Sequence, residues 1–344
     1  MFAAGSLEYR RNPHAAGRSN PLLFVAGVLT ALMIGLRFEV GGDWINYEEI
    51  YLLMAYADFG YAATYSDPGY AVLNWLSAQL GYGMWFVNLV CGLIFTWGLI
   101  KFVRREPNPW LCALVAVPYL IIVVAMGYTR QGVAIGLILA GLSILDRGSL
   151  LRFTVYILLA ASFHKSAIVV LPLVALAANR DRVVTGAILA ATAVLVYYLF
   201  VQDQIDRLVT NYVEAEYSSQ GATIRVVMNL PPALIFFAFR KRFAFAAQPD
   251  LLWRNFALAA LAALFLLVMT TSTTAVDRLA LYLIPLQIVI LGRLPDALAT
   301  RNQSRMALVL AVILYSAAIQ FVWLNYAVNA FAWVPYQNYL WIPG

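Results

Sequence analysis

Runs of apolar residues recur along most of the chain, and many approach the ~20 residues that an α-helix needs to cross a bilayer. Short charged clusters separate the runs, and no run alternates as the strands of a membrane barrel do. The pattern predicts eleven membrane-spanning helices, at about 21–37, 84–102, 109–127, 130–146, 150–163, 166–178, 183–201, 225–239, 252–272, 277–293 and 306–323.

Composition supports this assignment. Of the 344 residues, 63% are hydrophobic and 12% are charged, and the mean hydropathy is +0.77. A soluble protein of this length would carry about twice the charge. We therefore expect an all-α, polytopic integral membrane protein whose residues 1–344 form a single transmembrane domain. Cys91 and Cys112 lie in apolar runs without ligand-spaced partners, so we expect both to be buried packing residues.

Several segments lie outside the predicted spans, and three of them carry further predictions. Residues 1–20 are polar and basic and lack the apolar region of a signal peptide, so we interpret them as a cytoplasmic arm. Residues 38–83 and 202–224 form outer-face segments with amphipathic helices, of which Trp44–Tyr56 and Tyr70–Leu80 are expected to lie in the membrane interface. Within the span at 225–239, the pair Pro231-Pro232 predicts a kink.

The distribution of Lys and Arg tests this topology. Seventeen of the 23 fall on one side of the predicted membrane, and six fall on the other. Since cytoplasmic loops carry the excess of positive charge, the side with seventeen is the cytoplasmic one. The six outer cations are Arg37, Arg130, Lys165, Arg207, Arg225 and Arg278.

Four of these outer cations lie at the ends of predicted spans, where their side chains can turn inward. For each, a structural reading is available: snorkelling toward headgroups, or pairing with a neighbour, as Arg278 can with Asp277. Four guanidiniums at one depth on different helices favour convergence on an anionic substrate, because the planar fork suits phosphate oxygens and stays charged when desolvated. The four are Arg37, Arg130, Arg225 and Arg278.

Acid–base candidates share this depth. Asp43 follows a Gly pair that can end the first helix and direct the carboxylate back to the membrane; it is either a catalytic base or a counter-ion. His164 lies at the tip of a short helical hairpin, where it is either structural or placed to exchange protons. Asp67 and Asp277 are weaker candidates, since a turn or an ion pair accounts for each.

Aromatic residues of the outer segment offer sugar-stacking surfaces. The candidates are Tyr47, Tyr70, Trp44 and Trp75, although an interfacial aromatic belt is the stronger explanation for them. The chain has no phosphate-cradling Gly-Lys loop, dinucleotide fingerprint, zinc-ligand spacing or Gly-x-Ser-x-Gly elbow. We therefore expect no metal, no cofactor and no nucleotide-driven chemistry, and no nucleic acid partner.

Taken in order, the motifs resemble the EpsG family of exopolysaccharide polymerases, which are Wzy-like membrane proteins. They are Gly35-Leu36-Arg37, Gly42-Asp43-Trp44 with Tyr47, Asp67-Pro68-Gly69-Tyr70 with Asn74, Arg130-Gln131 with Ala134, Phe163-His164 with Ser166-Ala167, and Asp277-Arg278 with Tyr282 and Pro285. Two departures are Asp67, where the family commonly has Glu, and the start of the chain, where relatives often have a further span.

The resemblance implies a GT-C-like, metal-independent glycosyltransferase in the bacterial inner membrane. It would polymerise polyprenyl-diphosphate-linked oligosaccharide repeat units at the outer face, with Asp43 or His164 as the base and the four outer arginines on the diphosphate. The sugar and the acceptor would then meet Tyr47, Asp67, Tyr70, Gln131, Asp277 and Tyr282. Membrane lipids, a chain-length regulator and export proteins are the further partners it implies.

Other classes of protein stay open at this point. A flippase or transporter of lipid-linked sugars would also use outer arginines, but it predicts charge near the middle of the membrane, and the span interiors are almost free of charge. A non-catalytic scaffold of an export complex would leave the outer polar residues without a role. Within the enzyme class, a glycan ligase or an acyltransferase also fits.

Overall fold

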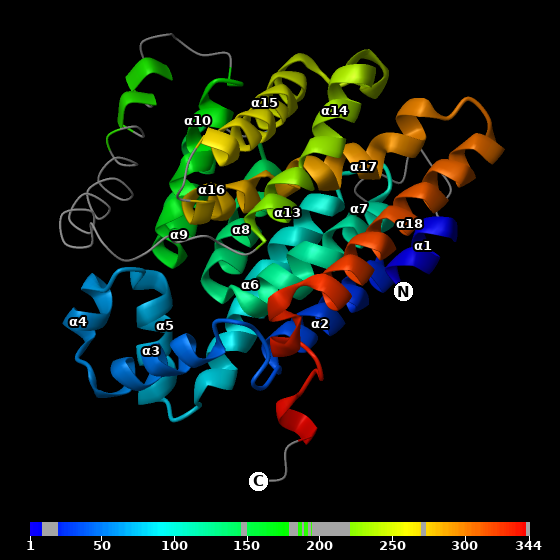
Figure 1. Ribbon diagram of the computed structural model, residues 1–344. Coiled ribbons are helices and arrows are strands. Elements are labelled where there is room, and N and C mark those ends of the chain that lie inside the picture. The colour runs from blue at the N-terminus through cyan, green and yellow to red at the C-terminus, as the bar shows by residue number, and fades with distance from the viewer. Residues whose placement is uncertain are drawn as a thin grey trace.

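The computed structural model describes residues 1–8, 20–145, 150–178, 221–269 and 273–341, together with 185–187, 189–191 and 194. Every element in these ranges is helical, and the one β-bridge among them joins Arg37 to Asn338. The helices pack into one elongated bundle, beside which the outer segment forms a smaller group (Figure 1). Among the described residues, five helices are long and apolar enough to cross a membrane, at Met84–Val103, Ala222–Phe243, Ala247–Met269, Val276–Leu298 and Asn302–Tyr326.

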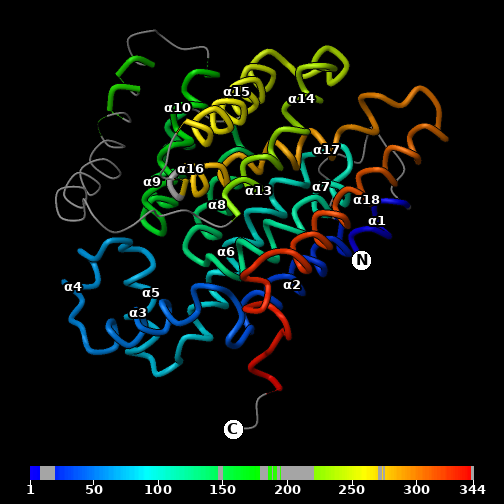
Figure 2. The backbone as a smooth tube through the Cα atoms, viewed as in Figure 1, coloured from blue at the N-terminus to red at the C-terminus, as the bar shows by residue number. Residues whose placement is uncertain are grey.

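Helix α8 (Thr129–Leu142) is the centre of the bundle. All its residues are buried except Arg130, as expected of a helix that is apolar on every side. It packs against α6 (Met84–Val103) and α9 (Leu150–Phe163), and α6 packs in turn against α2 (Pro21–Gly35). Figure 2 shows these segments side by side. Gly98 of α6 and Gly136 of α8 let the two backbones touch.

A second group of helices covers the other side of the bundle. Helix α7 (Pro109–Ala116) continues as the π-helix η1 (Val117–Ala125) and packs on α17 (Ile284–Leu298) and α18 (Asn302–Tyr326). Within the predicted cytoplasmic arm, α1 (Phe2–Glu8) packs on α7 through the rings of Phe2 and Trp110. Further elements are η2 (Lys165–Val169), α10 (Val170–Ala175), η4 (Arg240–Phe243), α15 (Ala247–Met269), α16 (Thr273–Ala280), η5 (Leu281–Leu283), η6 (Val328–Ala332) and η7 (Tyr339–Trp341).

Proline and glycine positions explain where the helices break. The predicted kink is present as a break at Met228 and Asn229, between α13 (Ala222–Val227) and α14 (Leu230–Phe239), just before Pro231-Pro232. The hairpin at 150–178 has its predicted polar tip, because α9 ends at Phe163 and η2 begins at Lys165. Cys91 and Cys112 are both buried, as expected.

The outer segment contains three short helices, α3 (Trp44–Tyr56), α4 (Phe59–Thr64) and α5 (Pro68–Gln79). The first has the predicted bounds, and α5 begins two residues before the predicted Tyr70. Helix α5 packs on α6 and α9, so it holds the group against the bundle (Figure 1). Exposed Ile45 and Leu52 on α3 are consistent with the predicted interfacial position.

The count of eleven spans stays a prediction. Several predicted spans correspond to helices that are short or interrupted, such as α7 with η1 and η2 with α10. The predicted span at 183–201 and almost all of the outer segment at 202–224 lie outside the described residues.

Replacement of Gly98 by Ala tests the α6–α8 contact. A Cβ at this position would overlap the carbonyl group of Gly136, which is backbone and cannot rotate away. Ala favours a helix over Gly by up to about 1 kcal/mol, but overpacking costs about 1–3 kcal/mol. We therefore expect Gly98→Ala to lower the thermal unfolding midpoint in detergent.

Gly27→Ala on α2 is the matched control for this substitution. Its new Cβ would first meet Cγ1 of Ile100, at 2.9 Å, and that side chain can move. The unfolding midpoint should therefore fall less. Equal midpoints for the two variants would contradict close backbone packing as the role of Gly98.

Candidate functional site

A pocket of about 310 Å³ opens at the end of the bundle where α2 ends and α8 begins. It brings together eight of the twelve predicted site residues: Asp43, Tyr47, Arg130, Gln131, His164, Arg225, Asp277 and Arg278. Tyr128, Leu281 and Asn329 complete the wall. The contributions come from segments far apart in the sequence, so the pocket exists only in the folded chain.

Arg130 projects from the first turn of α8. Its Nη1 atom lies 2.6 Å from Oδ2 of Asp67, and its guanidinium carbon lies 5.7 Å from the centre of the Tyr47 ring. Asp67 is buried and does not line the pocket; its other oxygen accepts from the backbone N–H of Lys165 at 3.3 Å. Asp67 therefore ties Arg130 to the tip of the α9–η2 hairpin.

Arg225 of α13 is held by residues of α16 and η1 and by Tyr128, which directly precedes α8. It forms an ion pair with Asp277 of α16, and its Nε donates to the hydroxyl of Tyr119 at 2.7 Å. Its Nη2 donates to the hydroxyl of Tyr128 at 3.2 Å. Tyr119 belongs to the π-helix η1, so the widened turn carries a ligand of the arginine. These contacts within the protein fix the orientation of the guanidinium.

His164, Ser166 and Tyr282 form a chain of hydrogen bonds. Nδ1 of His164 lies 2.6 Å from Oγ of Ser166, which lies 2.9 Å from the hydroxyl of Tyr282. Burial, and then the charges of Arg130, Arg278 and Lys165, lower the pKa of the His164 imidazole to about 3. The ring is therefore neutral at physiological pH, and Tyr282 lies behind the pocket wall as its support.

Asp43 reaches the pocket because of the turn that precedes it. Glu39 and Gly41 both have positive φ, of 50° and 115°, and a Cβ on Gly41 would lie 2.6 Å from the carbonyl oxygen of Met126. Only glycine permits this close approach. Asp43 occupies the N-cap position of α3 but makes no capping hydrogen bond with its side chain. Burial raises the pKa of its carboxyl group, and nearby arginines only partly oppose that shift.

Arg37 and Tyr70 lie outside the pocket wall. Arg37 is 1% exposed, and its guanidinium donates to the carbonyls of Ile34 and Val40, to Oδ1 of Asn88 at 3.0 Å and to Oγ1 of Thr129 at 2.6 Å. It thereby joins the ends of α2, α6 and α8. The ring of Tyr70 is buried against that of Tyr47, with 5.5 Å between centroids. The geometry gives both residues a supporting position behind the wall.

Gln131 and Arg278 are linked through the backbone. The Gln131 amide donates from Nε2 to the carbonyl of Arg278 at 2.7 Å, so α8 fixes the last turn of α16. The Arg278 side chain itself is exposed on the pocket side. Among the described residues, no group of three or more His, Cys, Asp or Glu side chains is placed to hold a metal ion.

The sequence analysis missed the residues that complete and support the wall. Tyr128 directly precedes Thr129-Arg130, and this adjacency was the available signal. Tyr119 lies inside an apolar run, where nothing marks it. Asn329 comes from the segment that follows α18. Trp333 anchors this segment, because its Nε1 donates to the carbonyl of Ile122 at 2.7 Å.

Substitution of Arg37 tests its supporting position. A lysine ammonium cannot reach the four acceptors that the guanidinium satisfies, and each buried group left unsatisfied costs about 1–3 kcal/mol. We expect Arg37→Lys to lower the free energy of unfolding by at least about 2 kcal/mol, measured by thermal or denaturant unfolding in detergent. The exposed Arg104→Lys serves as control and should change it little; comparable stability of the two variants would refute this assignment.

Comparison with known proteins gives one match. No curated protein and no solved structure matches the sequence. The sequence model described as the EpsG family matches residues 21–338, which is nearly the whole chain. With its apolar helices, this protein is a multi-pass membrane protein. The chain belongs to the EpsG family, a family of Wzy-like polymerases.

Proposed function

We propose that this protein polymerises polyprenyl-diphosphate-linked oligosaccharide repeat units into exopolysaccharide at the outer face of the bacterial inner membrane. The family supports an exopolysaccharide polymerase-type function in general. The observation that carries the specific proposal is the convergence of Arg130, Arg225 and Arg278, from three different helices, on one pocket that also holds a carboxylate and an imidazole.

The three arginines would receive the lipid diphosphate. When the bond to the anomeric carbon breaks, negative charge grows on the leaving diphosphate, and donors already oriented toward it stabilise the transition state most effectively. Asp67 holds Arg130, and Asp277 with Tyr119 holds Arg225, so two of the three are oriented in advance. In this proposal the arginines take the place of a metal ion.

Asp43 is the better general base of the two candidates. A base works best when its pKa lies near the operating pH. Burial raises the pKa of the Asp43 carboxyl toward that range, whereas it holds the pKa of the His164 imidazole far below it. The acceptor hydroxyl would give its proton to Asp43 as its oxygen bonds to the anomeric carbon. The electron pair of the broken C–O bond leaves with the diphosphate. Neutral His164 would orient the acceptor by hydrogen bonding.

The size of the pocket fits the reacting groups alone. About 310 Å³ is at the low end for small-molecule sites, so we infer that it holds the diphosphate and the sugars next to the bond. Tyr47 and Gln131 of the wall are proposed to contact sugar, while Tyr70, Asp67 and Tyr282 act through the residues they hold. The exposed apolar face of α3 would lie against the lipid tail. Arg37 would position Arg130 through Thr129.

The alternative of a flippase is less well supported. A flippase needs a polar route between the two faces, but from Val133 to Leu142 the central helix α8 consists of buried apolar residues and glycines. A glycan ligase would use the same pocket and differ in its acceptor.

Replacement of Arg278 tests the diphosphate site. Because its side chain is exposed, Arg278→Gln should leave the fold intact. Loss of one such donor typically lowers kcat by about 100-fold or more. The measurement is the rate at which purified protein in detergent lengthens a lipid-diphosphate-linked repeat unit, followed as a glycan ladder on gels. The matched control is Arg242→Gln, an exposed arginine at the other end of the bundle.

An unchanged ladder in Arg278→Gln would refute the diphosphate site. A second variant, Arg225→Gln/Asp277→Asn, removes the pair together and so leaves no unpaired buried charge. It should also abolish the ladder. If wild-type protein made no ladder but moved the lipid-linked sugar across vesicles, the flippase would replace the polymerase.

The pH dependence of polymerisation distinguishes the two candidate bases. Because Asp43 must be ionised, activity should fall as the pH drops through its pKa, and burial places that midpoint above the range of an ordinary aspartate. We expect His164→Gln to slow the reaction without moving the midpoint, because its imidazole is neutral down to about pH 3. Asp43→Asn should abolish activity, and Glu48→Gln, an exposed carboxylate on α3, should not.

The contrary outcome is equally specific. An acidic limb near the pKa of a free histidine that disappears in His164→Gln would make His164 the base. Asp43 would then be a counter-ion for the arginines.

A further inference from the structure

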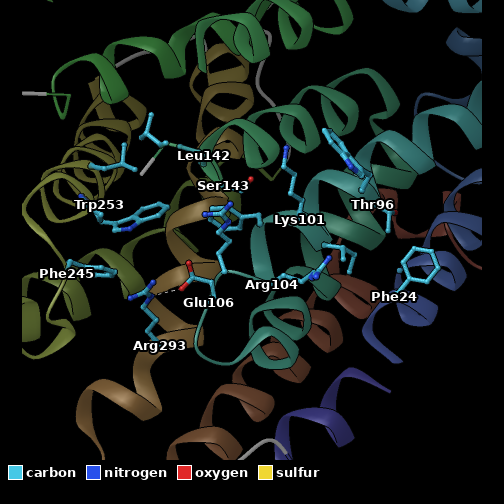
Figure 3. Close-up of a pocket in the computed structure, with 18 of the residues that line it drawn as sticks. Phe24, Thr96, Lys101, Arg104, Glu106, Leu142, Ser143, Phe245, Trp253 and Arg293 are labelled. Atoms are coloured by element: carbon cyan, nitrogen blue, oxygen red, sulfur yellow. Dashed lines mark hydrogen bonds and ion pairs between the residues drawn. The ribbon is translucent and has the colours of Figure 1, made fainter. Parts of the chain in front are cut away.

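A second cavity, of about 1030 Å³, lies at the opposite end of the bundle, and the proposed function does not use it. It forms where α2 and α15 begin and where α6 and α8 end, with Arg293 of α17 on its wall (Figure 3). In the orientation that the Lys and Arg distribution predicts, this is the cytoplasmic end. The two cavities therefore face opposite sides of the membrane.

The part of this cavity nearest the bilayer centre is an apolar groove between α2 and α6. Gly27 and Ala31 form its floor, and they are buried and carry little or no side chain. Phe24 and Trp97 stand on either side, 67% and 48% exposed, on helices that lie within the membrane. The groove spans about two helical turns, roughly 10 Å, and its apolar lining suits an acyl chain.

The other part of the cavity is basic. Lys101, Arg104 and Arg105 line it at the end of α6, and both arginine side chains are exposed. Lys101 is held in place, since its Nζ lies 2.9 Å from the hydroxyl of Tyr156 and 4.7 Å from the centre of the Trp97 ring. The basic end thus adjoins the apolar groove on the same helix.

One carboxylate lines the cavity in the described part of the chain, and it is already engaged. Glu106 is buried and accepts from Nε of Arg293 at 2.5 Å, as the dashed line in Figure 3 shows. The other two lining arginines, Arg104 and Arg105, therefore have no second carboxylate among the described lining residues. This charge distribution complements an anion located at the membrane surface.

We propose that the cavity binds one anionic phospholipid of the cytoplasmic leaflet. Its phosphate would lie at Arg104 and Arg105, and one acyl chain would lie in the groove beside Gly27. Free phosphate would leave the groove unused, and a neutral lipid would leave the cations unused. Basic pockets between helices on this side of a membrane are known to suit anionic headgroups. A lipid there would bridge α2, α6 and α15 and stabilise the folded state.

The headgroup half is tested by native mass spectrometry of the purified protein, titrated with phosphatidylglycerol or phosphatidylcholine. Each cation near an anionic surface contributes about fivefold to affinity, so Arg104→Gln/Arg105→Gln should weaken phosphatidylglycerol binding by about 25-fold. Both side chains are exposed, so the fold should survive, and the thermal unfolding midpoint in lipid-free detergent checks this. The control, Lys241→Gln/Arg242→Gln, removes the same charge from exposed positions that do not line the cavity.

The acyl half is tested by Val28→Trp, which fills the groove from an exposed position and leaves every charge in place. It should also weaken phosphatidylglycerol binding. The proposal is overturned if both cavity variants bind phosphatidylglycerol like the control, or if phosphatidylcholine binds equally well. It is also overturned if inorganic phosphate or a polyprenyl monophosphate displaces phosphatidylglycerol at equal concentration. None of these readouts requires polymerase activity.

Discussion

The rest of the structure depends on the hydrogen bonds that the buried guanidinium of Arg37 donates. The guanidinium lies where α2, α6 and α8 meet, and its hydrogen bonds to Asn88 and Thr129 convert three separate helix ends into one rigid junction. A charge so far from water is costly unless its donors are satisfied. The adjacent Thr129 begins the helix that carries Arg130, so the position of the pocket follows from this junction.

Two carboxylates orient arginines at the pocket. Asp67 pairs with Arg130 and Asp277 pairs with Arg225, and each carboxylate cancels part of the positive charge of its partner. Arg130 and Arg225 are thus oriented by the protein itself, and in the proposed function this lowers the reorganisation needed during the reaction. Arg278 differs from these two arginines. Its side chain is exposed on the pocket side, and Gln131 binds only its backbone carbonyl.

Much of this could be predicted from the sequence, because the relevant signals are local. The bounds of Trp44–Tyr56 and Leu150–Phe163 follow from turns and charges beside them, and the place of Arg130, Arg225 and Arg278 at predicted span ends agrees with their position in one pocket. The partners could not be predicted, since Arg130 meets Asp67 across 63 residues and Arg225 meets Tyr119 across 106. Arg37 has the same local pattern as the pocket arginines; only packing reveals that it faces carbonyls.

The last described segment has a consequence for how the protein matures. Asn329 forms part of the pocket wall, Trp333 anchors its segment to η1, and Asn338 pairs with Arg37 by backbone bridging. The N-terminal helices emerge from the ribosome and enter the membrane long before these residues exist. The wall therefore closes late, after translation has passed α18. Until then a nascent chain presents an incomplete pocket.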